Sequence, residues 1–173
     1  QALELSGKPK RWLLKDPSHI GHLPEILKTY PNAKFIHIHR DPSESVGSFC
    51  SLTKNVRSAF TRKIDTHVIG QTVIDFWNHN LEKGMSDRKS LSDNQIVDIQ
   101  YDEFINNPIE VIKHTYSQLN FDMNIATENN IQNYLIKDKE ITKLKHKYSL
   151  EEYGLSKQII KSQFRDYMLN YDF

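Results

Sequence analysis

An arginine stands at the end of an apolar, strand-like segment, directly before residues that typically start a helix. The segment 34–40 ends in Arg40, and Asp41 and a proline follow it. Because a helix N-terminus presents free backbone N–H groups, these groups and the guanidinium could bind one anion together. Ser48 lies about two helical turns further on, where its hydroxyl could share a phosphate with Arg40. The alternative is that Arg40 pairs with a carboxylate such as Asp41 or Glu44 and that Ser48 is an ordinary helical serine.

Two further segments end in polar residues that could act on a ligand. Lys15 follows an apolar run, and His19 comes four residues later in a loop, where a histidine could be a general base. Tyr101 ends a third apolar segment, and its ring could stack on a base. The ordinary alternatives are a solvated histidine, a surface lysine in an ion pair, and a tyrosine that packs in the core.

A metal site is a competing interpretation of the second segment. His37 and His39 alternate on a predicted strand and so point to one face, and with Asp41 they form the His-x-His-x-Asp pattern of some metallohydrolases. The rest of that pattern needs a histidine after the aspartate, where Pro42 stands. The alternative is a pair of histidines that hydrogen-bond beneath a helix.

The elements that must position these residues alternate between strands and helices. We predict strands at 12–14, 34–40 and 96–101, and helices near 24–30, 42–50, 69–81, 108–119, 127–146 and 160–168, with a short turn at 149–154 that Gly154 closes. This order predicts βαβ units, hence an α/β fold with a parallel sheet and helices on both faces, in three layers. Ligands in such sheets bind at the carboxyl ends of the strands, where Lys15, Arg40 and Tyr101 are expected.

Composition favours one domain without a general affinity for polyanions. The 173 residues are 38% hydrophobic and 26% charged, with 23 basic against 22 acidic side chains. This balance argues against nucleic-acid binding, and no segment is long and apolar enough for a membrane span. The single cysteine, Cys50, excludes an internal disulfide framework and favours a cytoplasmic location.

Taken in order, the polar segments resemble those of one known family. The similarity rests on Lys15-Asp16-Pro17-Ser18-His19, on Arg40-Asp41-Pro42 with Ser48, on Tyr101-Asp102-Glu103-Phe104 with Asn107-Pro108, and on the tail Tyr148-Ser149-Leu150-Glu151-Glu152-Tyr153-Gly154-Leu155. Together they resemble the sulfotransferase family, and the tail resembles its bacterial-type branch.

The resemblance implies a P-loop-kinase-like fold and transfer of a sulfuryl group from 3′-phosphoadenosine 5′-phosphosulfate to a hydroxyl or amine. It implies that Arg40 and Ser48 bind the 3′-phosphate and that Tyr101 lies near the adenine. It also implies that His19 deprotonates the acceptor and that Lys15 stabilises charge on the bridging oxygen. No metal is needed for these roles. The implied acceptor is a small molecule, a carbohydrate or a lipid.

The loop with which the family grips the 5′-phosphosulfate is not found in the sequence. Ser6-Gly7-Lys8-Pro9 is too short and precedes the wrong strand. We therefore expect 1–173 to be the C-terminal part of a longer single domain, inactive alone and prone to self-associate through 12–14. Two alternatives remain: a catalytically inactive nucleotide-binding module, and a metal-dependent hydrolase that uses His37, His39 and Asp41.

Overall fold

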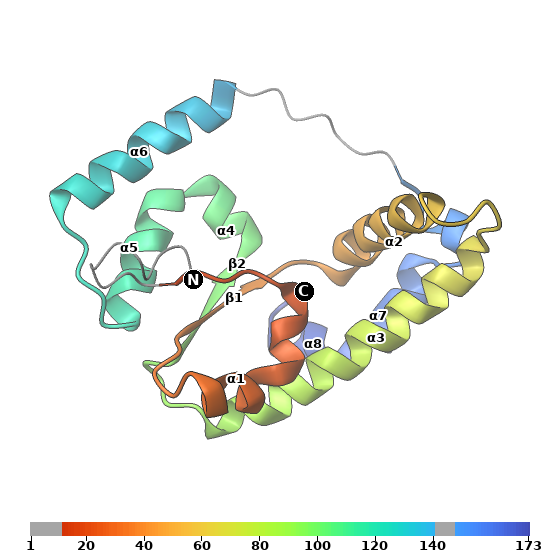
Figure 1. Cartoon of the computed structure of the whole chain (residues 1–173), viewed down its shortest axis with the longest axis horizontal. Helices are drawn as coiled ribbons and strands as arrows, with labels where there is room; N and C mark the ends of the chain where they lie inside the picture. Colours follow the sequence, from red (N-terminus) through yellow and green to blue (C-terminus); the bar gives the residue numbers. More distant parts are fainter. Residues whose placement is uncertain (1–11, 141–147) are drawn as a thin grey trace.

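The computed structural model describes residues 12–140 and 148–173 as an α/β arrangement around a small sheet (Figure 1). The strands are β1 (Phe35–His39) and β2 (Ile96–Gln100). The helices are α1 (Leu23–Thr29), α2 (Pro42–Ser58), α3 (Thr66–Asp87), α4 (Tyr101–Asn106), α5 (Pro108–Gln118), α6 (Ile125–Glu140), α7 (Lys157–Gln163) and α8 (Arg165–Asn170). Short 3-10 turns are η2 (Pro17–His22), η3 (Arg88–Ser90) and η4 (Glu151–Tyr153).

The two strands are parallel, as the alternation of strands and helices predicts. Phe35 is opposite Ile96, and His39 is opposite Gln100. The connection between them runs through α2 and α3, because parallel neighbours need a long crossover. Their carboxyl ends therefore meet at one edge of the sheet, where α2 and α4 begin.

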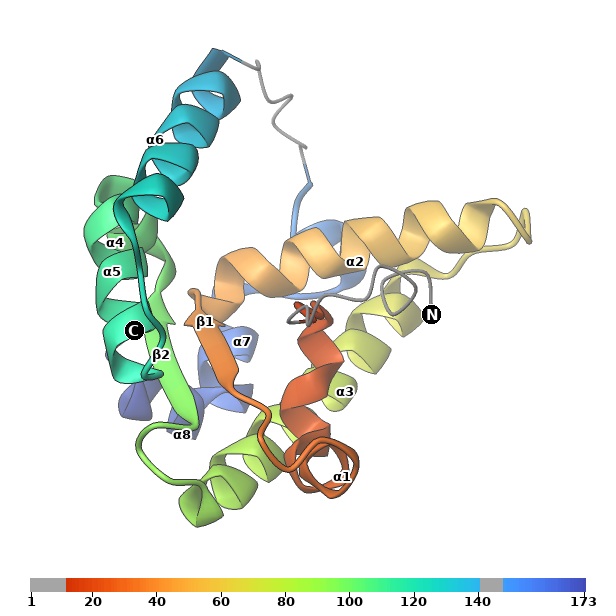
Figure 2. The same cartoon turned by 60° about the vertical axis from the view of Figure 1, so that its left-hand side comes forward.

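The two faces of the sheet differ in polarity. Alternate residues of β2, Val97 and Ile99, are buried, and β2 contacts α4 and α5. On β1 the corresponding Ile36 and Ile38 are about half exposed. Because side chains alternate along a strand, the histidines of β1 point to the opposite face, where His39 contacts Tyr167 of α8. Figure 2 shows the two strands and α8 from the side.

The predicted strand at 12–14 is wrong. Residues 12–16 have no regular secondary structure, and Trp12, Leu13 and Leu14 are all exposed. A strand needs a neighbour for its backbone hydrogen bonds, and within the described residues β1 pairs only with β2. The apolar run therefore has no regular secondary structure, and the described part of the sheet has two strands where the sequence predicted three.

The main core lies between α2, α3 and the C-terminal helices. Cys50 and Ile69 are fully buried there with Ile160 of α7, and the buried Phe164 and Met168 belong to the same core. Burial raises the pKa of the Cys50 thiol to about 11, so that this cysteine is a packing residue. This core holds α2, and therefore its N-terminus, in a fixed position relative to the sheet.

Several predicted helices differ in their bounds. The predicted helix 69–81 is extended at both ends to Thr66–Asp87, and the predicted helix 160–168 is two short helices, α7 and α8, which meet at Phe164. The end of the predicted helix 127–146 lies outside the described residues. Gly154 closes the turn before α7 with φ of 67°, as predicted. Across the described ranges, every helix is too short or too polar to cross a bilayer.

Candidate functional site

Arg40 leaves the carboxyl end of β1, and α2 begins two residues later. Asp41 caps α2, because its Oδ1 accepts a hydrogen bond of 2.7 Å from the backbone N–H of Ser43. Pro42 takes the first helical position, where the missing N–H costs no hydrogen bond. The predicted start of this helix is confirmed. It places Arg40 beside the positive end of a helix dipole.

Two neighbours fix the Arg40 side chain. Its Nε and Nη2 donate hydrogen bonds of 3.0 and 2.9 Å to Oε2 of Glu44. Its Cζ lies 4.5 Å from the centroid of the Tyr101 ring, within the range of a cation–π contact. Burial lowers the pKa of Arg40, but the hydrogen bonds and charge of Glu44 outweigh this effect and raise it overall. The structure thus brings Arg40 and Tyr101 together and also pairs Arg40 with a carboxylate, which is Glu44 and not Asp41.

Ser48 lies one helical turn beyond Glu44 on α2. Residues four apart share a face of a helix, so Ser48 extends the face that Glu44 begins. Its side chain is exposed, and its hydroxyl makes no hydrogen bond to another residue in the described ranges. The hydroxyl is therefore available to a ligand that approaches this face.

A tyrosine from the C-terminal part covers the start of α2. The Tyr148 hydroxyl donates a hydrogen bond of 2.9 Å to the carbonyl oxygen of Glu44. A Cβ atom at Gly47 would lie only 2.6 Å from Cε2 of Tyr148, so the absence of a side chain lets the ring pack against the helix. Sequence reasoning used Tyr148 only as part of a family motif and missed Gly47, because neither residue type signals a long-range contact.

Lys15 and His19 lie on a separate segment. Lys15 is exposed, and His19 is partly buried in η2. Asp16 caps η2 through hydrogen bonds from the backbone and hydroxyl of Ser18, which lower the pKa of Asp16. Among the described residues, no hydrogen bond, ion pair or ring contact joins Lys15 or His19 to Arg40. The structure therefore leaves the two predicted halves of the site without a direct link.

The η2 segment is nevertheless docked firmly on α3. A Cβ at Gly84 would lie 2.6 Å from Cγ1 of Ile20, and one at Gly21 would lie 2.0 Å from Oδ1 of Asn80. These two close approaches let the turn lie directly on the helix. The position of His19 is thus set by packing of η2 against α3.

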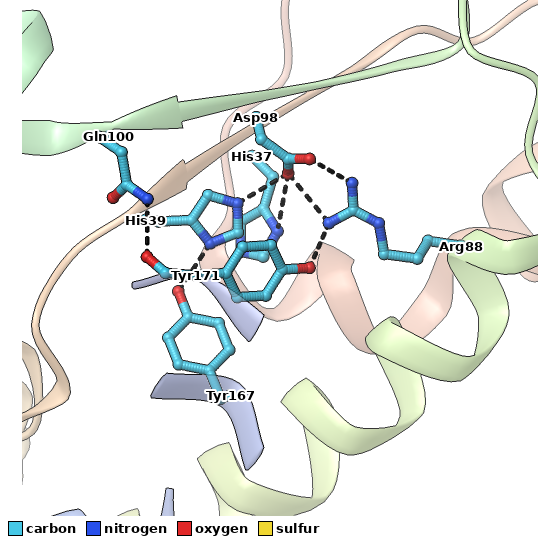
Figure 3. A network of polar contacts seen from close by, with 7 residues as sticks. All are labelled: His37, His39, Arg88, Asp98, Gln100, Tyr167 and Tyr171. Carbon is cyan, nitrogen blue, oxygen red and sulfur yellow. Dashed lines mark hydrogen bonds and ion pairs between the residues drawn. The ribbon is translucent and has the colours of Figure 1, made fainter. Parts of the chain in front are cut away.

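A partly buried polar network joins β1 and β2 to α8 (Figure 3). His39 is fully buried, with Nδ1 2.8 Å from the Tyr167 hydroxyl and Nε2 2.7 Å from Oδ1 of Asp98. Asp98 also accepts hydrogen bonds from both terminal nitrogens of Arg88. Burial raises the pKa of Asp98, but the hydrogen bonds from His39 and Arg88 outweigh it and hold the pKa well below its usual range.

His37, the other histidine of β1, is neutral in this network. Burial, followed by the nearby His39, lowers the pKa of His37 to about 3. Its Nδ1 is buried and lies 3.9 Å from Oδ1 of Asp98, too far for a hydrogen bond. The rings of His37 and His39 are 3.9 Å apart, and that of His39 stacks on Tyr171 at 3.8 Å.

These groups resemble a metal site only in part. His37, His39 and Asp98 present ligand atoms within 4.8 Å of one another, and such residues bind zinc and related ions. However, both ring nitrogens of His39 have hydrogen-bond partners, and Arg88 neutralises Asp98 and would repel a cation. Asp41, the third residue of the predicted pattern, caps α2 instead. The structure thus puts Asp98, and not Asp41, beside the two histidines, and of these histidines His39 is the one held by hydrogen bonds.

The family follows from the sequence itself. A family model described as "Sulfotransferase family" matches residues 1–124, which include Lys15, His19, Arg40, Ser48 and Tyr101. The chain belongs to the sulfotransferase family. A curated relative is the omega-hydroxy-beta-dihydromenaquinone-9 sulfotransferase Stf3 of Mycobacterium bovis, 27% identical over 116 residues, or 64% of this chain and 29% of the relative.

Solved sulfotransferases share the fold. The crystal structure of STF9 from Mycobacterium avium matches 97% of this chain with a TM-score of 0.85 and 27% identity. That of STF1 from Mycobacterium tuberculosis matches 91% with a TM-score of 0.78 and 26% identity. The matched region is 43% of the STF9 chain and 40% of the STF1 chain, so this sulfotransferase chain spans less than half the length of these relatives.

Proposed function

We propose that this chain provides the 3′-phosphate and acceptor sides of a sulfotransferase site that uses 3′-phosphoadenosine 5′-phosphosulfate. The observation that carries the proposal is the contact between Arg40 and the Tyr101 ring at the N-terminus of α2. A guanidinium and a flat ring are groups that recognise a phosphate attached to a nucleoside. The exposed hydroxyl of Ser48 adds a further donor on the same helix.

In this proposal the nucleotide lies along the carboxyl edge of the sheet. Arg40 and Ser48 donate hydrogen bonds to the 3′-phosphate, and the Tyr101 ring lies against the adenine. Ligands of parallel α/β sheets bind at this edge, which supports the placement. We further propose that the described elements are part of a three-layer, P-loop-kinase-like domain. In this proposal residues 1–173 belong to one domain, whose sheet has more strands than the two described. We also propose that the protein is cytoplasmic.

The reaction we propose is an in-line displacement at sulfur. His19 accepts the proton of the acceptor hydroxyl, the acceptor oxygen forms a bond to sulfur, and the bond from sulfur to the 5′-phosphate oxygen breaks. The electron pair of that bond leaves with adenosine 3′,5′-bisphosphate, and Lys15 stabilises the negative charge that develops on the bridging oxygen. The chemistry needs positioned charge and a base, and none of its steps needs a metal.

For the acceptor we propose a hydroxyl on a lipid-like carrier. The name of the relative Stf3 specifies a hydroxylated dihydromenaquinone, and 27% identity over the shared region makes a similar acceptor class the first to try. A panel with a long-chain alcohol, a simple sugar and a phenol tests this choice through transfer of radiolabelled sulfate. Transfer to the sugar alone would contradict it.

The test of the nucleotide site is titration calorimetry with adenosine 3′,5′-bisphosphate. We expect Arg40→Ala to weaken binding about tenfold or more, because a hydrogen bond to a charged group contributes about 1.5 to 3 kcal/mol. Ser48→Ala should cost less, since its hydroxyl is neutral. Unchanged affinity in Arg40→Ala would refute the proposed site.

An inactive nucleotide-binding module is the second candidate. One observation favours it: among the described residues, no hydrogen bond, ion pair or ring contact joins the proposed catalytic residues Lys15 and His19 to Arg40. The two candidates predict the same binding but different chemistry. Transfer that depends on His19 supports the enzyme, and binding without transfer in every preparation supports the module.

A further inference from the structure

Glu44 occupies hydrogen-bond donors of Arg40 that a phosphate would need. A guanidinium carries five N–H donors in one plane. Glu44 accepts two of them, one from Nε and one from Nη2, with a single carboxylate oxygen. The Nε and Nη2 donors of Arg40, which could bind two oxygens of one oxyanion, are therefore bound by a side chain of the protein itself.

The carboxylate of Glu44 can leave this position without disturbing the helix. The backbone of Glu44 is held by the hydrogen bond from the Tyr148 hydroxyl to the Glu44 carbonyl. Its side chain, in contrast, is 58% exposed and lies in the first turn of α2. Rotation of an exposed side chain into water leaves the helix cap of Asp41 and the packing of Gly47 unchanged.

We propose that Glu44 is an internal competitor for Arg40, which holds the guanidinium on the Tyr101 ring in the free protein and yields it to the 3′-phosphate of the nucleotide. This inference rests on the proposed function. A phosphate monoester near neutral pH carries close to two negative charges and three acceptor oxygens, whereas a carboxylate carries one charge and two oxygens. The phosphate is thus the stronger partner, and like-charge repulsion drives Glu44 away as it arrives.

The arrangement has two consequences for recognition. Arg40 is already ordered before the nucleotide arrives, so that less side-chain conformational entropy is lost on binding. Singly charged anions must displace an equal charge and gain little, so the site should favour a dianionic phosphate. Glu44 therefore costs affinity and adds specificity.

The test compares Glu44→Gln with wild type in titrations with adenosine 3′,5′-bisphosphate at one ionic strength. The variant keeps the length of the side chain and removes its charge. We expect binding to become about three- to tenfold tighter, because an exposed ion pair no longer has to be exchanged and a repulsive charge is gone. Glu110→Gln is the matched control: it makes the same change of net charge beside Lys113 on α5, and its affinity should equal that of wild type.

The same titration in an Arg40→Ala background separates the possible failures. If Glu44 acts through Arg40, the gain from Glu44→Gln should largely disappear there. Equal or weaker binding in the single variant Glu44→Gln, or an equal gain in both backgrounds, overturns this inference. If wild type fails to bind the nucleotide, or Arg40→Ala binds it as well as wild type, the proposed function fails and this inference with it.

Discussion

The guanidinium of Arg40 lies over the ring of Tyr101, with Cζ 4.5 Å from the ring centroid, although the two residues follow different strands. Each comes directly after its strand, and the register places His39 opposite Gln100. The contact therefore depends on the parallel pairing of β1 with β2. A shift of one residue in this register would point alternate side chains of one strand to the wrong face and separate the pair.

The ring of Tyr101, and not its hydroxyl, should matter for nucleotide binding. We expect Tyr101→Ala to weaken adenosine 3′,5′-bisphosphate binding about tenfold, because stacking of an aromatic side chain on a base contributes about 1 to 3 kcal/mol. Tyr101→Phe should bind almost as wild type does. Calorimetry measures both, with Tyr134→Ala, an exposed tyrosine of α6, as the control. An equal loss in Tyr101→Phe and Tyr101→Ala would show that the hydroxyl is the important group.

The sequence predicted much of the edge where β1 ends. The β-branched and apolar pattern located both strands within a residue or two, and Asp41 with Pro42 marked the start of α2. These signals are local, because a strand period and a helix cap are each encoded within a few residues. The approach of Arg40 to Tyr101 followed from them through a general rule about parallel sheets.

The partners from distant parts of the chain could not be predicted in this way. Asp98, Arg88 and Tyr167 meet around His39 only after the sheet and the C-terminal helices have packed, and no spacing in the sequence encodes that meeting. The prediction of a strand at 12–14 was wrong for a related reason. Three apolar residues indicate burial, but burial depends on what covers them.

His19 should be needed for chemistry but not for binding. In a preparation that transfers sulfate, we expect His19→Ala to lower turnover about 10² to 10⁴-fold, the usual contribution of a positioned general base, and to leave bisphosphate affinity nearly unchanged. His22→Ala is the matched control, since His22 is an exposed histidine at the end of the same η2 turn. Turnover within a few-fold of wild type in His19→Ala would show that His19 is only a loop histidine.

The largely buried His37 should make the fold sensitive to acid. Its pKa is about 3 in the folded chain against an ordinary value of 6.5, so between these pH values the unfolded chain binds a proton that the folded chain does not. The contribution of His37 to stability is therefore complete above about pH 6.5 and is lost as the pH falls towards 3. The free energy of unfolding should fall with a slope of at most about 1.4 kcal/mol per pH unit from this residue.

Urea unfolding at pH 6.5, 5.5 and 4.5 measures this slope. His37→Asn removes the titrating group and should show a shallower dependence on pH than wild type. His79→Asn, which removes an exposed histidine of α3, should keep the wild-type slope. The same slope in wild type and in His37→Asn would show that His37 does not stay neutral in the folded protein.

Tyr167 links α8 to the end of β1. Its hydroxyl lies 2.8 Å from Nδ1 of the buried His39, and the backbone N–H of Arg40 faces the same oxygen. Tyr167→Phe removes the hydroxyl that pairs with these two buried polar groups. Each group left without a hydrogen bond costs about 1 to 3 kcal/mol of stability. We expect a loss of stability of that size.

The positioning role has a separate readout, because a general loss of stability does not change the affinity of the molecules that remain folded. If Tyr167 holds the end of β1 in place, Tyr167→Phe should also weaken adenosine 3′,5′-bisphosphate binding several-fold at a temperature where the protein stays fully folded. Tyr134→Phe, on the exposed face of α6, should change neither stability nor affinity. A destabilised Tyr167→Phe that binds the nucleotide as wild type does would show that α8 supports the sheet without positioning Arg40.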